Sequence, residues 1–263
     1  MLDLKWSGRP HGDRALLGAV VSTGSLCIYS LSNNGNFESH ESAAAEGAPL
    51  LLSLDWADRL GRADDRIVTT SSAGEVSIWR LANGGLSLET NWTGHDLECW
   101  VAAFASDSSD IVYSGADDCV FKSWDLRCGT DTPVAFNRRS HSMGVTTIQA
   151  SPHRANTLVT GSYDEHVRVW DTRSLARPVS ETRTPGGGVW RIKHRPDRDN
   201  ELLVAAMHSG AFVLRAEDGG AYEVARHYTE HTSLGYGADW HPSRHGLVAT
   251  CSFYDHSLHL WNV

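Results

Sequence analysis

The stretch TLVTGSYDEHVRVWD, residues 157–171, contains two short runs of alternating apolar and polar residues on either side of a polar turn. Both runs are rich in β-branched residues, and Gly, Ser and Asp bound them, which is typical of two antiparallel strands. A third run of this kind, VTTIQAS (145–151), comes just before them. The segment therefore predicts a small antiparallel sheet whose third strand ends in a Trp-Asp pair.

The same three-part pattern recurs along the 263 residues, and the intervals between successive closing positions are 50, 45, 46, 44 and 47 residues. The closing positions are Tyr29, Trp79, Trp124, Trp170, Leu214 and Trp261. A period of about 45 residues with strand-like units is typical of β-propeller blades. We therefore predict an all-β fold, a WD-repeat β-propeller in a single domain, 1–263. Its six recognisable blades begin near residues 2, 52, 100, 145, 189 and 236.

Fourth, outer strands are predicted in several blades, for example at SLETNW (87–92), PVAFNR (133–138) and YEVARH (222–227). The last blade has no such strand before the chain ends, and the chain opens on LDLKW (2–6), which has the pattern of a first strand. An open ring would expose strand edges that promote aggregation. We expect that a seventh, N-terminal blade is missing, and the alternative is a closed ring of six blades.

The bulk properties limit the class of function. A net charge of −9 is opposite in sign to that of nucleic-acid-binding proteins, so no nucleic-acid partner is expected. No apolar run reaches the roughly 20 residues of a membrane span, and the first residues, MLDLKWSGRPHGDR, do not form a signal peptide. The five cysteines are scattered and form no CxxC pair, which favours a reducing compartment and a cytoplasmic protein. We expect no metal and no cofactor.

Several His, Asp and Trp residues recur at the blade period and are therefore predicted to be scaffold. In a WD-type blade, a His, a Ser or Thr, an Asp and the Trp form a buried hydrogen-bond network. A His–Asp dyad of a hydrolase is the alternative interpretation. The predicted sets are His95, Ser114, Asp118 and Trp124; His141, Thr160, Asp164 and Trp170; and His231, Asp255 and Trp261 with Cys251 or Ser252.

Other polar and aromatic residues fall in the turns and loops that meet at one end of a propeller, although the scaffold does not require them. We predict that they line a pocket at this rim, and the alternative is an ordinary solvated surface. The aromatic candidates are Tyr163, Trp190, Tyr236, Tyr254 and Trp100. The polar candidates are His208, His166, Glu165 and Arg191.

Several phrases of the sequence resemble one family of WD-repeat proteins. They are YSGADD (113–118), SHSMGVTTIQASPHR (140–154), GSYDEH (161–166), GGGVWR (186–191), MHSG (207–210), YGADW (236–240) and ATCSFYDHSLHLW (249–261). Together they are similar to the diphthine methyl ester hydrolases, long called diphthine methyltransferases, from about residue 98 to the C-terminus. The resemblance is weaker before residue 98. Members of this family carry one further blade ahead of the position of LDLKW.

This resemblance implies hydrolysis of the methyl ester of methylated diphthine on elongation factor 2, a step in diphthamide biosynthesis. The substrate carries a trimethylammonium group, which the predicted aromatic residues could hold by cation–π contacts. Ester cleavage needs a base for water and donors for the oxyanion. We expect His208 or His166 as the base, with Glu165 orienting it. Arg191 or the amides of Gly186–Gly188 would stabilise the oxyanion.

Two non-catalytic roles remain open. WDLR (124–127) and WDTR (170–173) resemble the Trp-Asp-x-Arg boxes of substrate receptors of cullin-4 ubiquitin ligases, so a ligase adaptor is a possible partner. These arginines could equally be solvated strand ends. The protein could also present elongation factor 2 to another enzyme without chemistry of its own.

Overall fold

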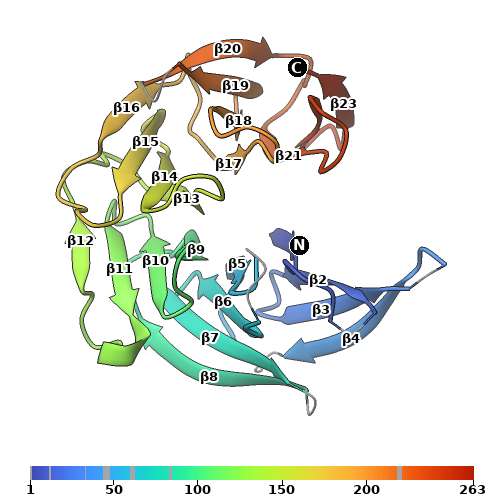
Figure 1. The fold of residues 1–263 in the computed structure, drawn as a ribbon, viewed down its shortest axis with the longest axis vertical. Coiled ribbons are helices and arrows are strands. Elements are labelled where there is room, and N and C mark those ends of the chain that lie inside the picture. The colour runs from blue at the N-terminus through green and yellow to red at the C-terminus, as the bar shows by residue number, and fades with distance from the viewer. Residues whose placement is uncertain are drawn as a thin grey trace. The chain divides into compact units, whose positions relative to one another are not determined.

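The computed structural model describes residues 2–11, 13–32, 34–43, 48–59, 63–82, 85–217 and 221–263, and antiparallel strands make up nearly all of its regular structure. The chain divides into two compact units, Met1–Phe136 and Asn137–Val263. The strands form five four-stranded sheets and one three-stranded sheet, and within each sheet they follow one another in chain order (Figure 1). These sheets are the six blades of a β-propeller, which confirms the predicted fold class.

The first unit contains blades 1 to 3. Blade 1 consists of β1 (Asp3–Trp6), β2 (Ala15–Val20), β3 (Leu26–Leu31) and β4 (Phe37–Ala43). Blade 2 consists of β5 (Leu51–Trp56), β6 (Arg66–Ser71), β7 (Glu75–Ala82) and β8 (Gly85–Thr93). Blade 3 consists of β9 (Val101–Phe104), β10 (Ile111–Gly115), β11 (Phe121–Asp125) and β12 (Ala135–Asn137), with the short 3-10 helix η1 (Leu126–Cys128) before β12.

The second unit contains blades 4 to 6. Blade 4 consists of β13 (Val145–Ala150), β14 (Thr157–Ser162), β15 (His166–Asp171) and β16 (Ser180–Arg183). Blade 5 consists of β17 (Arg191–His194), β18 (Glu201–Ala205), β19 (Ala211–Ala216) and β20 (Tyr222–Tyr228). Blade 6 has three strands among the described residues, β21 (Gly235–Trp240), β22 (Leu247–Ser252) and β23 (Leu258–Asn262).

The predicted blade starts lie within two residues of the observed first strands, and the predicted outer strands are β8, β12 and β20. A missing seventh blade and a single domain stay predictions. Blade 6 exposes 67% of both Leu258 and Leu260 on β23. In the described part of the chain no helix has the length and hydropathy of a membrane span.

The hydrophobic core lies between neighbouring blades within each unit. In the first unit Ile28, Leu54 and Trp56 pack together from blades 1 and 2, and a comparable cluster joins blades 4 and 5 of the second unit. The same polar contact accompanies this packing twice. The Trp56 indole donates to Lys5 O at 2.9 Å, and the indole of Trp240 donates to the equivalent carbonyl of blade 5 at 3.1 Å. Blades are thus held both by apolar burial and by one directional bond.

The turn between the second and third strands ends in the same way in all six blades. In every blade its last residue has a positive φ and donates its N–H to the carbonyl three residues before. These residues are Gly24, Gly74, Cys119, Glu165, Gly210 and His256, with φ values of 77°, 76°, 63°, 69°, 74° and 51°. Gly adopts this conformation without strain, whereas the other three residues do not. The turn therefore fixes the direction of their side chains at the end of the blade.

One buried hydroxyl on the second strand links the parts of a blade. In blade 3, Ser114 Oγ accepts from the Trp124 indole at 2.8 Å and lies 2.8 Å from His95 Nε2. Nδ1 of the same histidine lies 2.9 Å from Asp118. Blade 3 therefore has the complete network predicted from the sequence. In blade 4, Thr160 Oγ1 makes the corresponding contacts at 2.9 Å with Trp170 and with the histidine of that blade.

In blade 6 the predicted hydrogen-bond network is wrong at two positions. Thr250, and not Cys251 or Ser252, accepts from the Trp261 indole at 3.1 Å and lies 2.8 Å from His231 Nε2. The reason is the strand register, because Val248 pairs with Trp261 and the next inward-facing residue is Thr250. Cys251 is exposed on the opposite face.

Asp255 also differs from the prediction, since its carboxylate accepts from Thr232 N and Oγ1, at 3.2 and 2.9 Å, and from Ser252. Ser257 takes the expected place beside His231, with its Oγ 3.0 Å from Nδ1. The His–hydroxyl–Trp contact is therefore common to the blades that carry this histidine, whereas the aspartate contact is not.

Thr160→Val is expected to lower the free energy of unfolding by about 1–3 kcal/mol, because the buried Trp170 indole loses its acceptor and the buried His141 ring loses its hydroxyl partner, while the side-chain volume is kept. Urea unfolding followed by tryptophan fluorescence would measure the change. Thr157→Val is the matched control, since its hydroxyl donates to Ala155 O at an exposed site, and a change within about 0.5 kcal/mol is expected. Equal losses in both variants would contradict the role of the buried hydroxyl.

Candidate functional site

Five aromatic rings of the second unit form a continuous series, which we call the aromatic series. Tyr163 and Trp190 have ring centroids 5.9 Å apart, and Trp190 and Tyr236 are 5.0 Å apart. Tyr236 is followed by Phe253 at 5.9 Å, and Phe253 by Tyr254 at 5.0 Å. The rings come from three different blades. The structure thus brings together four predicted aromatic residues and adds Phe253, whose signal in the sequence is its place beside Tyr254 in the same turn.

Backbone hydrogen bonds within blade 5 and between blades 5 and 6 hold the middle of the series. Trp190 N donates to Ala205 O at 2.8 Å. Met207 and Gly235 exchange two backbone bonds of 3.1 and 2.9 Å, which ties the β18–β19 turn to the residue directly before Tyr236. The ring of Tyr236 is therefore placed by the same turn that contains His208.

The glycine loop 186–188 packs against this turn and against Tyr163. Gly187 has a φ of 70°, and a Cβ there would lie 2.1 Å from Ala206 O. A Cβ on Gly188 would lie 2.8 Å from Tyr163 Cδ1. Only a loop without side chains can approach both neighbours this closely. The sequence GGG thus brings backbone amides beside the turn of His208 and beside one end of the aromatic series.

The predicted polar residues of blade 5 have different surroundings. His208 is exposed, and among the described residues it has no hydrogen-bond or ion-pair partner. Arg191 is half-buried at the start of β17, where it pairs in register with Ala205. A histidine whose ring nitrogens bond to no neighbouring side chain can accept a proton from water, which is the role of a general base.

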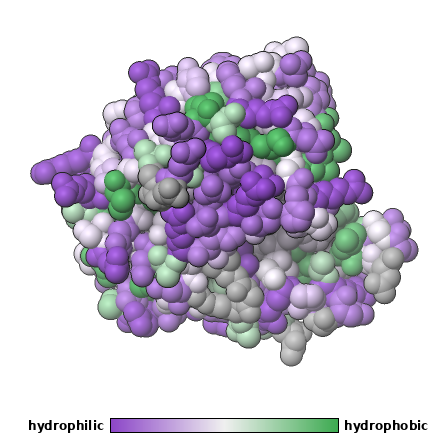
Figure 2. Space-filling model, turned by 45° about the horizontal axis from the view of Figure 1, so that its top comes forward, coloured by the Kyte–Doolittle hydropathy of each residue, from purple (hydrophilic) through white to green (hydrophobic). Residues whose placement is uncertain are grey.

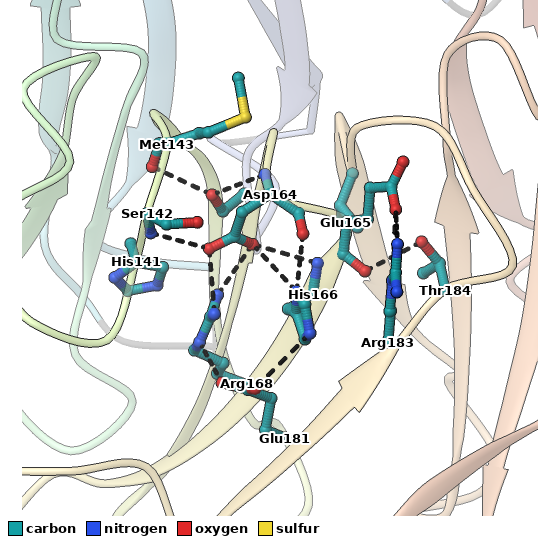
Figure 3. Close-up of polar contacts among 12 residues, drawn as sticks. His141, Ser142, Met143, Asp164, Glu165, His166, Arg168, Glu181, Arg183 and Thr184 are labelled. Carbon is teal, nitrogen blue, oxygen red and sulfur yellow. Dashed lines mark hydrogen bonds and ion pairs between the residues drawn. The ribbon is translucent and has the colours of Figure 1, made fainter.

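In blade 4 the polar groups are engaged with one another (Figure 3). His166 Nδ1 lies 2.6 Å from Asp164 O, and its Nε2 lies 3.5 Å from Glu181 Oε1. Glu165 instead accepts from Arg183 at 3.0 Å. The expectation that Glu165 orients His166 is therefore wrong in this geometry, because Asp164 and Glu181 face the His166 ring. The positive φ of Glu165 directs its carboxylate toward β16.

Asp164 also departs from the expected network of its blade. Its carboxylate accepts from Arg168 at 2.9 Å and from Ser142 N at 3.0 Å. The cause is the residue four positions after the aspartate, which is Arg168 in blade 4 and Lys122 in blade 3. Lys122 Nζ bonds to Gly94 O instead of to Asp118, so that aspartate contacts the histidine of its blade. Burial alone would raise the pKa of Asp164, but the bonds from Arg168 and Ser142 outweigh it, and the pKa lies below its ordinary value.

His141, the buried histidine of blade 4, is held neutral. Burial, with the positive charge of Arg168 as a second cause, lowers the pKa of His141 to about 3, although Asp164 opposes this effect. Its ring stacks on Trp170 with centroids 5.7 Å apart. These contacts identify His141 as scaffold, in agreement with its recurrence at the blade period.

Trp100 lies in the first unit, where its indole donates to Asp117 at 3.1 Å. Its predicted place in the same pocket stays a prediction. The described residues contain no group of three or more His, Cys, Asp or Glu side chains that could hold a metal ion. The face shown in Figure 2 is largely hydrophilic, with hydrophobic residues in separate small patches, so apolar surface alone does not single out a site.

A cavity of about 230 Å³ lies at another place, between blades 4 and 5. Its lining includes Trp170, Asp171 and Arg173 of the WDTR motif together with His194 and Tyr222. None of the predicted rim residues lines it. The cavity and the aromatic series are therefore separate features of the second unit.

The blades and their buried networks define a WD-repeat β-propeller, and the WD domain, G-beta repeat family matches residues 134–171. A chain in a crystal structure of the mitotic checkpoint complex has the same fold, with a TM-score of 0.78 at 19% identity over 99% of this chain and 73% of that chain.

Relatives identify the family more closely. The human diphthine methyltransferase is 39% identical over 91% of this chain and 55% of its own length. The Dictyostelium discoideum diphthine methyltransferase homolog is 33% identical over 99% of this chain and 76% of its own length. The chain belongs to the diphthine methyltransferase family. It spans little more than half of the length of the human relative.

The stability of the protein is expected to fall on mild acidification because of His141. With a pKa of about 3 in the folded chain, this ring takes up a proton only after unfolding at any pH between about 3 and 6.5. The free energy of unfolding should therefore decrease as the pH falls through this window. His141→Gln should reduce the difference between about pH 7 and about pH 5 by about 2 kcal/mol in urea unfolding. An identical difference in both proteins would contradict it.

Gly187→Ala is expected to destabilise the protein by roughly 2–4 kcal/mol, because the methyl group meets a backbone carbonyl at a positive φ. Gly35→Ala separates the two causes, since Gly35 has a φ of 83° and its added methyl group would have no neighbour within 4 Å. This control should lose about 1 kcal/mol. Thermal unfolding of both variants would measure the losses, and a loss for Gly187→Ala no greater than the control would contradict the close approach.

Proposed function

We propose that the protein hydrolyses the methyl ester of methylated diphthine on elongation factor 2 and yields diphthine, a step of diphthamide biosynthesis that takes place in the cytoplasm. The observation that carries this proposal is the aromatic series, in which half-buried Tyr163, Trp190 and Tyr236 lie within 6 Å of their neighbours. Membership of the diphthine methyltransferase family supports it.

The series suits the charged end of this substrate. A trimethylammonium group has no N–H to donate, so ring faces and not hydrogen-bond acceptors must hold it. Trp190 is the central ring, with a tyrosine on either side at 5.9 and 5.0 Å. The net charge of −9 favours approach of a cation.

The ester then lies where the neighbouring turn can act on it. His208 accepts a proton from water, the resulting hydroxide adds to the ester carbonyl, and the oxygen of that carbonyl becomes an oxyanion. Amides of Gly186–Gly188 or Arg191 stabilise this charge. The intermediate breaks its bond to the methoxy group, which leaves as methanol with the proton from His208, and the acid remains. His166 is the alternative base, although its ring already contacts Asp164 and Glu181.

A non-catalytic adaptor is the alternative function, and the cavity between blades 4 and 5 favours it. Arg173 of the WDTR motif lines this cavity and is 72% exposed while it pairs with Asp171. Arg127 of the WDLR motif pairs with Asp125 in the same way. An exposed arginine beside a cavity can serve as a docking contact, for which a cullin-4 ligase adaptor is the candidate partner.

Mass spectrometry of elongation factor 2 bearing the methyl ester tests the proposal. Incubation with the protein should lower the substrate mass by about 14 Da as ester becomes acid, and His208→Ala should reduce the rate by about 10²–10⁴. Trp190→Ala should raise KM about tenfold or more, because the ammonium loses its central ring. The matched control is His245→Ala, an exposed histidine of the opposite loops.

Full activity of both His208→Ala and His166→Ala would overturn the assignment of the base. No mass loss with this chain or with a form extended to the length of its relatives would overturn hydrolysis. Co-purification with a ligase adaptor, lost in Arg173→Ala, would then establish the alternative.

A further inference from the structure

The aromatic series becomes more exposed from its middle toward its end in the β22–β23 turn. Trp190 and Tyr236 are half-buried, whereas Phe253 and Tyr254 are 59% and 71% exposed. A trimethylammonium group fills the space between two or three rings, so the last two rings extend beyond what that group requires. Exposed large apolar side chains next to a binding site are typical of an interaction surface.

The turn that carries these two rings is held rigidly. Phe253 N donates to Leu234 O at 3.0 Å, and Tyr254 N donates to Ser233 Oγ at 3.0 Å. The next residue, Asp255, accepts from Thr232 N and Oγ1 and from Ser257 N at 3.2, 2.9 and 3.2 Å. A turn whose backbone is already ordered loses little entropy on binding, which favours the aromatic side chains that it carries as anchor residues in an interface.

The order of the rings gives the direction of approach. A side chain whose cationic end lies at Trp190 must leave its own backbone outside the half-buried rings. Phe253 contacts Tyr236 edge-on at 81°, and Tyr254 contacts Phe253 edge-on at 89°. The two exposed rings therefore follow the binding site outward, toward the polypeptide on which the modified side chain is mounted.

We propose that Phe253 and Tyr254 form the docking surface for the folded protein that carries the modified side chain, and that they contact the polypeptide surface immediately around it. The proposal rests on the proposed function for the identity of that protein. It divides the aromatic series into an inner part that recognises the cation and an outer part that recognises the carrier.

The test compares two substrates, the methyl-esterified elongation factor 2 and a short peptide with the same modified residue. Phe253→Ser should lower kcat/KM for the whole protein about tenfold, mainly through KM, because an anchor residue is lost. The same variant should leave kcat/KM for the peptide unchanged, and Phe253→Leu should restore most of the loss. Val224→Ser is the matched control, since Val224 is an exposed apolar residue on β20, the outer strand of another blade of the same unit, and does not line the cavity.

An equal loss for both substrates, or no loss for either, would overturn the proposal. Binding of unmodified elongation factor 2 provides a second measurement that needs no chemistry. Wild-type protein and Val224→Ser should bind it, and Tyr254→Ser should bind it about tenfold more weakly. If the wild-type protein cleaves neither substrate, the proposed function fails while this binding still decides the docking surface, and absence of binding overturns it.

Discussion

The buried hydroxyl on the second strand is the contact on which the blades depend. Ser114, Thr160 and Thr250 each accept from a tryptophan of the third strand and lie beside a histidine that precedes the first strand. One oxygen thus joins the second strand, the third strand and the segment before the first strand, inside a low-dielectric interior where such bonds are strong. The turns and loops at that end of the blade start from this fixed point. The positions of Tyr163 in blade 4 and of Phe253 and Tyr254 in blade 6 are tied to it in this way.

The sequence contains enough information for the blades, but not for every polar partner. Periodic tryptophans and alternating apolar residues predict the strands, because burial repeats with the strand period. The sequence prediction named Cys251 or Ser252 and missed Thr250, because the residue that meets the Trp261 indole depends on a pairing register that is set in space. The partner of the Asp164 carboxylate could not be predicted from the sequence either. An arginine at residue 168 reaches that carboxylate, whereas the lysine of blade 3 bonds to a carbonyl.

At the rim as well, the sequence predicts which aromatic residues lie together, whereas only the structure shows how the charged residues pair. Four predicted aromatic residues do come together, because fold topology brings the same loops of successive blades to one end. The predicted charges behave differently, since those of blade 4 neutralise each other through Glu165–Arg183 and Arg168–Glu181 contacts. The proposed recognition of a cation therefore relies on ring faces more than on carboxylates. It is an arrangement that depends little on salt, in contrast to exposed ion pairs.

The repeated turn before the third strand has a consequence for how the blades could diverge. Its last residue always has a positive φ, and glycine is the residue that adopts it freely. Cys119, Glu165 and His256 occupy the position at a cost of about 1–2 kcal/mol each. A chain selected for stability alone would have glycine in all six blades. The three departures place a side chain where the backbone prefers glycine, so local strain singles out the turns of blades 3, 4 and 6 from those of the other blades.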